Sequence, residues 1–134
     1  MFTLLFDARE KVMLTRYSGV FSSDDISSHD EFVAGFIARE GYYVRNIFDF
    51  TAVEAVAVPR PRLLERGRKL RTNPGQDRVV VAPQREIYEL FHAYAEAQLD
   101  IGNGRMIVVQ RIDEALRLLG LREPNFQPLM RRAS

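Results

Sequence analysis

Short apolar runs alternate with amphipathic stretches along most of the chain, and this alternation constrains the fold more than any other feature of the sequence. Val79–Ala82 and Met106–Val109 are short and wholly apolar, which is typical of strands buried on both faces of a parallel sheet. Tyr42–Phe50 is rich in aromatic and branched side chains and is predicted to be the central strand. A stretch with the period of a helix follows each run, so the sequence predicts repeated units of strand and helix.

Four helices are predicted from apolar residues at helical spacing. The first begins at the serines and aspartates that follow Phe21 and ends at Gly41. Pro59 and Pro61 mark the first turn of the second helix, where a proline loses no hydrogen bond. Gly67 lies on the apolar side of this helix, so we expect the helix to approach the sheet closely there. The four predicted helices span residues 22–41, 59–70, 84–99 and 112–120.

At the amino terminus, Phe2–Phe6 and Val12–Tyr17 are predicted to form an antiparallel hairpin that ends at Gly19. The complete order is then ββαβαβαβα, a single α/β domain at residues 1–121 with a five-stranded, mostly parallel sheet and an antiparallel first strand. Residues 122–134 depart from the pattern and are predicted to be an extended tail. The apolar side chains of this tail could pack on the domain or on a second subunit of a homodimer.

Composition excludes several classes of protein. The 134 residues carry a formal net charge of +1, so no overall field attracts the chain to nucleic acid or to an anionic membrane. The sequence has no cysteine, which excludes disulfides, thiol nucleophiles and thiolate metal sites. No apolar run approaches the length that a transmembrane helix needs, and residues 1–6 lack the features of a secretion signal. We therefore expect a soluble, cytoplasmic protein without a cofactor.

A resemblance to a known family lies between Asn46 and Lys69. The segment NIFDFTAVEAVAVPRPRLLERGRK, in this order of elements, resembles the STAS family of sporulation anti-sigma-factor antagonists. It is especially similar to the uncharacterised bacterial branch that is grouped with both STAS domains and CRAL-TRIO lipid carriers. Asp49, Thr51 and Val53 carry the match, together with the closing segment IDEALRLLG. The resemblance covers the whole predicted domain and implies a non-catalytic binding module for a partner protein or a small hydrophobic ligand.

The phosphorylation switch of the antagonists is not expected in this chain. In those proteins, a serine at the start of the helix is phosphorylated to release a partner kinase. The corresponding positions here are about Ala57, Val58 and Pro59, and none of these residues has a hydroxyl group. The resemblance therefore implies a binding function that is not regulated by phosphorylation.

The candidate surface for a partner or ligand combines the carboxyl ends of the strands with the second helix. Ligands of open α/β sheets bind beyond those strand ends, and arginines on the helix could meet an anionic partner. For Asp49 the alternative role is to tie down loop amides, which is the commoner function of a carboxylate at a strand end. The predicted surface consists of Asp49, Thr51, Arg60, Arg62, Arg66, Gln84 and Arg85.

Six cations lie within twelve residues on and just after the predicted second helix, and they could neutralise phosphates of a nucleic acid, a nucleotide or an anionic lipid. The alternative is an ordinary solvated helix face. We favour this alternative because the net charge is close to zero and no aromatic residue lies among the arginines. The six cations are Arg60, Arg62, Arg66, Arg68, Lys69 and Arg71.

His29 and His92 are the only histidines, and they are too far apart in the sequence to have the spacing of metal ligands. His92 forms an i, i+4 stripe with Tyr88 and Glu96 that could support acid–base catalysis, although such a stripe is more often the rim of a packed helix. We therefore expect a non-catalytic interaction or regulatory domain. A carrier or sensor of a small hydrophobic or anionic ligand is the alternative, and an enzyme that uses His92 is the third hypothesis.

Overall fold

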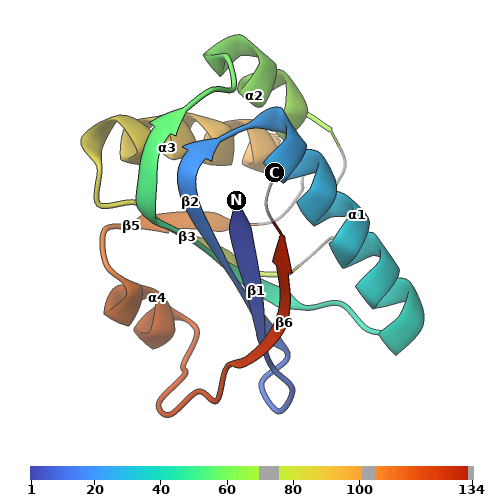
Figure 1. Ribbon diagram of the computed structural model, residues 1–134. Coiled ribbons are helices and arrows are strands. Elements are labelled where there is room, and N and C mark those ends of the chain that lie inside the picture. Colours follow the sequence, from blue (N-terminus) through green and yellow to red (C-terminus); the bar gives the residue numbers. More distant parts are fainter. Residues whose placement is uncertain (70–75, 101–104, 133–134) are drawn as a thin grey trace.

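The computed structural model describes residues 1–69, 76–100 and 105–132, and it has one six-stranded sheet with four helices (Figure 1). The strand order across the sheet is β5-β4-β3-β2-β1-β6. The α/β architecture predicted from the alternation of apolar and amphipathic stretches is confirmed. The elements are β1 (Phe2–Asp7), β2 (Val12–Phe21), α1 (Ser23–Glu40), β3 (Arg45–Val56), α2 (Arg60–Gly67), β4 (Arg78–Val81), α3 (Arg85–Asp100), β5 (Met106–Val109), α4 (Ile112–Leu118) and β6 (Gln127–Arg132).

The sixth strand lies in the segment that the sequence analysis described as an extended tail. β6 pairs antiparallel with β1, with Leu5 opposite Pro128 and Phe6 opposite Gln127. The prediction of five strands is therefore one short. A proline inside a strand is tolerated at the edge of a sheet, and β6 is an edge strand. Phe126, just before β6, packs on the body of the same chain against the apolar cluster beneath α4.

The parallel part of the sheet is formed by β2, β3, β4 and β5. The predicted positions of β4 and β5 are confirmed to within a residue or two. β2 and β3 run further toward their carboxyl ends than predicted, and β3 begins at Arg45 instead of Tyr42. β2 continues through Gly19, which adopts a left-handed conformation with a φ of +67°, to Phe21. The pairing of β2 with β3 shifts register twice on the way. These two strands therefore extend together past the end of β4.

The first helix has a hydrogen-bonded cap at each end. Ser22 and Asp25 form a capping box, in which each side chain accepts a hydrogen bond from the other residue's backbone N–H. Gly41 closes the helix in the left-handed conformation and donates its N–H to the Ile37 carbonyl. The capping residues predicted from the sequence are thus confirmed.

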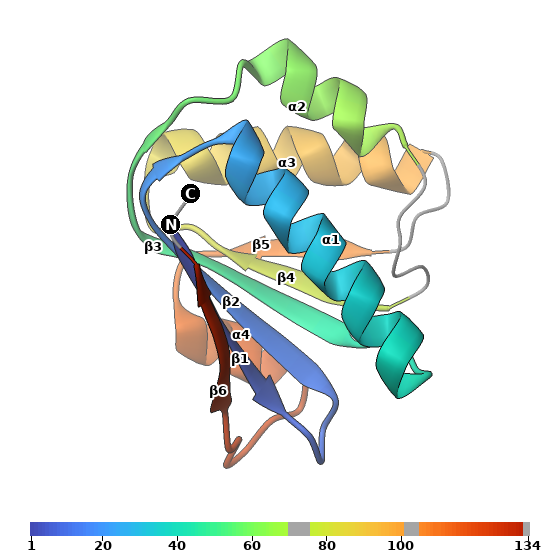
Figure 2. The ribbon, with the colours of Figure 1, turned by 45° about the vertical axis from the view of Figure 1, so that its right-hand side comes forward.

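The helices cover the sheet unequally. α1, α2 and α3 lie on one face and α4 lies on the other (Figure 2). The core on the three-helix face is rich in aromatic side chains, including Phe2, Tyr17, Phe50 and Phe91. The core on the α4 face is aliphatic and combines the alternate positions of β2, β3, β4 and β5 with Ala115 of α4, as the period of two in a strand requires.

Gly67 allows close packing, but the contact differs from the predicted one. A Cβ atom at this position would lie 3.3 Å from the Cβ of Ala97 and 3.3 Å from a ring carbon of Tyr94, both on α3. α2 therefore approaches α3 and not the sheet. The predicted turn at residues 73–75, the glycines at 102 and 104, and Arg71 lie outside the described residues.

Candidate functional site

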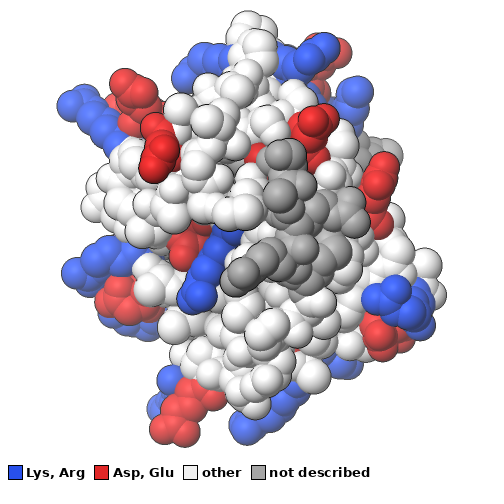
Figure 3. All heavy atoms as spheres, viewed as in Figure 1, with Lys and Arg blue, Asp and Glu red and all other residues white. Residues whose placement is uncertain are grey.

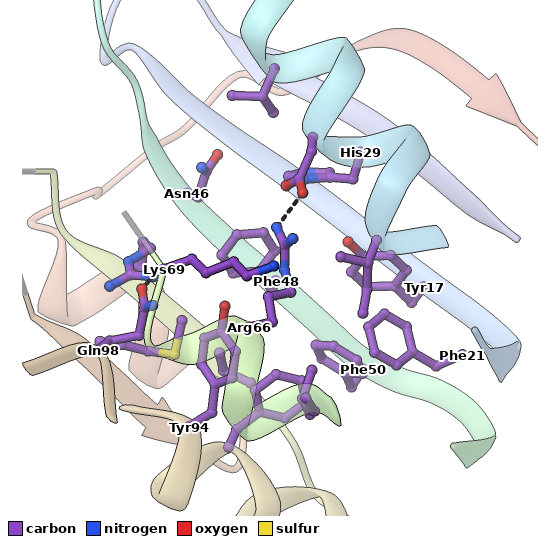
Figure 4. A pocket seen from close by; sticks show the side chains of 18 residues that line it. Tyr17, Phe21, His29, Asn46, Phe48, Phe50, Arg66, Lys69, Tyr94 and Gln98 are labelled. Carbon is purple, nitrogen blue, oxygen red and sulfur yellow. Dashed lines mark hydrogen bonds and ion pairs between the residues drawn. The ribbon is translucent and has the colours of Figure 1, made fainter. Parts of the chain in front are cut away.

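A cavity of about 320 Å³ lies between the sheet and the three helices α1, α2 and α3 (Figure 4). Native interiors contain few voids larger than a water molecule, whereas pockets for small ligands begin at about 300 Å³. The cavity is therefore the first candidate for a functional site. It is lined by Tyr17, Phe21, Ile26, His29, Asp30, Val33, Asn46, Phe48, Phe50, Leu63, Arg66, Lys69, Arg78, Val80, Phe91, Tyr94, Gln98 and Met106.

One end of the cavity is formed by aromatic rings from β2, β3 and α3. The ring of Phe50 lies 5.0 Å from that of Tyr17, 5.0 Å from that of Phe21 and 4.7 Å from that of Phe91, measured between centroids. Packed rings of this kind provide a rigid apolar surface. Burial raises the pKa of the Tyr17 hydroxyl, with the carboxylates of Asp30 and Asp25 acting in the same direction, so this hydroxyl is uncharged at neutral pH.

The opposite end is polar and begins at the first residues of β3 and β4, where Asn46 is paired with Arg78. Nη1 of Arg78 donates a hydrogen bond of 2.5 Å to Oε1 of Gln98, and Nε2 of Gln98 donates one of 2.5 Å to the Gly67 carbonyl. Gln98 is only 1% exposed and thus joins the sheet, α3 and α2 inside the protein. Burial lowers the pKa of Arg78 to about 10, which still leaves the guanidinium charged at neutral pH.

Asn46 presents a buried acceptor at this polar end. The residue is 3% exposed, and its Oδ1 atom has no hydrogen-bond partner within the described part of the chain. A buried carbonyl without a partner costs about 1 to 3 kcal/mol. Such an atom on the wall of a cavity can therefore accept a hydrogen bond from a hydroxyl or N–H group that enters the cavity.

An ion pair spans the top of the cavity between α1 and α2. Nη2 of Arg66 donates to Oδ2 of Asp30 (Figure 4), and the two side chains are 38% and 35% exposed. Burial raises the pKa of the Asp30 carboxyl, while the charge and the hydrogen bond of Arg66 oppose this shift. Burial also raises the pKa of Tyr94, against the opposing charges of Arg66 and Arg78.

His29 lines the cavity in its neutral form. Its Nε2 atom lies 2.9 Å from the hydroxyl oxygen of Thr15, which is fully buried. Burial lowers the pKa of His29 to about 4, and the nearby charge of Arg66 adds to the effect. A histidine with this pKa is a weak base near pH 7.

Asp49 and Thr51, which were predicted as part of a binding surface, face away from the cavity. Phe48 and Phe50 line the cavity, so the residues between and beyond them on β3 point to the opposite face of the sheet. Oδ1 of Asp49 accepts hydrogen bonds from the backbone N–H of Thr51 at 3.0 Å and from its hydroxyl at 2.5 Å. Asp49 thus makes local backbone contacts, which was the alternative role considered for it.

The remaining predicted residues are spread over different environments. Gln84 donates from Nε2 to the carbonyls of Phe50 and Val53 at 2.8 and 2.9 Å, so it holds the part of β3 that extends past β4. Arg85 is exposed and pairs with Glu89 one turn away on α3. Arg60 and Arg62 are exposed on α2. Of the seven predicted residues, only Arg66 lines the cavity.

His92, the candidate base of the enzyme hypothesis, also lies outside the cavity. It is exposed on α3 and packs edge-on against the ring of Tyr88 at 4.6 Å. Glu96 is exposed as well. The stripe formed by Tyr88, His92 and Glu96 is therefore the outer rim of a packed helix.

The sequence analysis did not single out Asn46, Arg78 or Gln98. Each is a polar side chain at a position whose period places it on a buried face, and each is at most 4% exposed. A buried polar group is rare unless it has a partner or a function. These polar residues occupy positions where the period of the strand or helix predicts an apolar side chain, and this is the signal that could have indicated the cavity.

The described residues contain no further candidate for a metal or membrane site. Within residues 1–69, 76–100 and 105–132, no group of three histidine or acidic side chains could hold a metal ion. Over the same residues, none of the helices is long and apolar enough to cross a bilayer. On the face shown in Figure 3, basic and acidic side chains are interspersed, as expected for a net charge of +1.

Comparisons with known proteins identify the fold. No protein-family model matches the sequence, and no curated protein matches it. Among solved structures, an uncharacterized protein of the DUF3478 family with a SpoIIAA-like fold, from Shewanella loihica PV-4, superposes with a TM-score of 0.57. The match covers 89% of this chain and 92% of that one. This chain has the SpoIIAA-like fold. The resemblance to the anti-sigma-factor antagonists is confirmed for the fold. The sequence identity to the matched structure is 9%, so the match shows the fold alone.

Proposed function

We propose that this SpoIIAA-like domain binds a small, mainly apolar molecule in the cavity beneath α1, α2 and α3, as a carrier or a sensor. The cavity is the observation that supports this function. Its volume of about 320 Å³ is far larger than a single water molecule needs. A sheet and helices that packed without a void would have argued against a carrier.

The lining favours a ligand with a large apolar part. Aromatic rings form one end, and Val33, Leu63 and Val80 contribute aliphatic side chains, each at most 3% exposed. Burial of apolar ligand surface against such walls stabilises a complex by roughly 25 cal/mol per Å² before the costs of binding. The proposed complex therefore draws its affinity from the apolar lining.

Binding without catalysis is the function that the side chains favour. The histidine in the cavity is bonded to Thr15 and has a pKa of about 4. A general base for reactions near pH 7 needs a pKa close to that pH. The carboxylate of Asp30 is already paired with Arg66.

Native mass spectrometry of the freshly purified protein, compared with a variant whose cavity is filled, tests this proposal. Val80→Phe places a larger side chain into the cavity, and Val20→Phe adds the same group at an exposed position of β2 as the control. The wild-type protein and the Val20 variant are expected to retain a small molecule, or to be stabilised by added indole. The Val80 variant should show neither effect while remaining folded.

The ligand proposal fails if the wild-type protein carries no small molecule and its unfolding transition does not shift with indole. Equal stabilisation of the wild-type and Val80→Phe proteins would place the indole site elsewhere. The circular dichroism spectrum of the Val80 variant checks that loss of binding does not come from unfolding.

A protein-interaction function is the second candidate, and the outer face of α2 is the feature that favours it. Arg60 and Arg62 on α2 and Arg68 just after it are exposed, and within the described residues none of the three forms a salt bridge at 4 Å or less. Such a face suits an acidic partner protein. The double variant Arg60→Glu and Arg62→Glu is expected to abolish partner capture without unfolding the domain, and unchanged capture would count against this surface.

A further inference from the structure

The polar and apolar parts of the cavity are separated along its length. In Figure 4, Tyr17, Phe21 and Phe50 lie at one end, whereas Asn46 and Gln98 lie at the other. The same separation follows from the sheet, because Phe50 comes four residues after Asn46 on β3. A ligand that fills the cavity therefore meets an apolar surface at one end and charged or polar groups toward the other.

The charges that line the cavity are mostly positive. Among the described lining residues, Arg66, Lys69 and Arg78 are cations and Asp30 is the one carboxylate. His29 is neutral at pH 7 because burial lowers its pKa to about 4. Cations that are partly shielded from water are stabilised more by an anionic guest than by a neutral one, and they repel a cationic guest.

Arg66 is the cation that is best placed to receive an anionic group. It projects from α2 over the cavity and already binds one carboxylate, that of Asp30 on α1. A guanidinium has five N–H donors, so it can contact a second carboxylate or exchange one for another. The buried Oδ1 atom of Asn46 gives the polar end a further contact for a hydroxyl group on the same ligand.

From this arrangement we propose that the ligand is an organic acid, with an apolar body among the aromatic rings and a carboxylate bound by Arg66. The inference rests on the proposed ligand-binding function and adds the chemical class of the ligand. The Asp30 carboxylate then competes with the carboxylate of the ligand for Arg66, and it holds Arg66 when no ligand is bound. Removal of the Asp30 charge should therefore strengthen the binding of an acid, which a purely structural ion pair would not do.

The test is isothermal titration calorimetry at pH 7 with two compounds of similar shape, 3-phenylpropanoate and 3-phenylpropan-1-ol. The wild-type protein is expected to bind the acid about tenfold or more tightly than the alcohol, since a hydrogen bond to a charged group is worth about a factor of ten or more. Arg66→Gln should remove this preference and leave the affinity for the alcohol unchanged. Arg62→Gln, on the exposed side of the same helix, is the matched control and should behave like the wild type.

Asp30→Asn should have the opposite effect to Arg66→Gln: it should tighten binding of the acid severalfold relative to the wild type. If the alcohol binds the wild type as tightly as the acid, the organic-acid inference is overturned and the ligand-binding function stands. If Asp30→Asn and Arg66→Gln weaken acid binding equally, the pair is structural and the role of Arg66 is overturned. Binding of neither compound would contradict the ligand-binding function itself, and with it the inference.

Discussion

Protonation of His29 should destabilise the fold as the pH falls below about 6.5. The imidazole is 6% exposed, bonded to Thr15 and surrounded by the rings of Phe2, Tyr17 and Phe48. Burial lowers its pKa to about 4, against about 6.5 in an unfolded chain. The unfolded state therefore takes up a proton before the folded state does, and stability is lost as the pH falls from the unfolded pKa toward the folded one.

The size of this effect follows from the two pKa values. A difference of about 2.5 pH units corresponds to a limit of roughly 3 kcal/mol, and about 2 kcal/mol should already be lost between pH 7 and pH 5. Asp30 acts in the opposite direction because its pKa is raised, so the folded state gains stability when this carboxyl is protonated. The contribution of His29 must therefore be measured as a difference between two proteins.

Urea unfolding followed by circular dichroism between pH 7 and pH 5 gives this difference for the wild type and His29→Gln. Glutamine can still bond to Thr15 but does not titrate in this range. The free energy of unfolding of the variant should fall about 2 kcal/mol less than that of the wild type over this interval. His92→Gln, at an exposed position of α3, is measured alongside as the matched histidine-to-glutamine substitution. Parallel curves for the wild type and His29→Gln would refute the argument.

Four further substitutions test the packing and the capping of the helices. Gln98→Leu removes the contacts to Arg78 and to the Gly67 carbonyl and should lower the free energy of unfolding by about 3 kcal/mol, as measured by urea unfolding. Gly67→Ala would place a Cβ atom 3.3 Å from atoms of α3, whereas the Cβ of Gly35→Ala would meet nothing within 4 Å. Thermal unfolding should show that Gly35→Ala stabilises the protein by up to about 1 kcal/mol. Gly67→Ala should be clearly less favourable in the same assay. Ser22→Ala removes the cap of α1 and should cost about 1 kcal/mol in the same assay, while an unchanged midpoint would contradict the role of the cap.

The strands and helices could be predicted from the sequence because their signals are local. The apolar runs of β4 and β5 and the capping residues of α1 are properties of a few consecutive residues. β6 was missed because its pairing with β1 joins residues more than 120 positions apart, and Pro128 interrupts its strand pattern. The extra length of β3 was missed because it depends on Gln84 and on pairing with β2.

The candidate site was predicted only in part, because a cavity depends on how separate elements face one another. Arg66 was identified from the charge on α2, but as part of an outer surface. Its position over the cavity depends on where α2 sits, and the close contact of Gly67 with α3 fixes that position. Asp49 was chosen from its place at a strand end, whereas the alternation of side chains along β3 places it on the opposite face from the cavity. The face of the sheet to which a side chain such as Asp49 points is known only once the register of the whole sheet is known.

Methyl NMR of the protein during titration with 3-phenylpropanoate measures the proposed use of the cavity most directly. Val33, Leu63 and Val80 have methyl groups on the cavity wall, whereas Val79 and Val81 face the aliphatic core under α4. Ligand binding in the cavity predicts saturable shifts of the first group and little change in the second. Unchanged methyl signals, or shifts confined to the α4 face, would contradict the account.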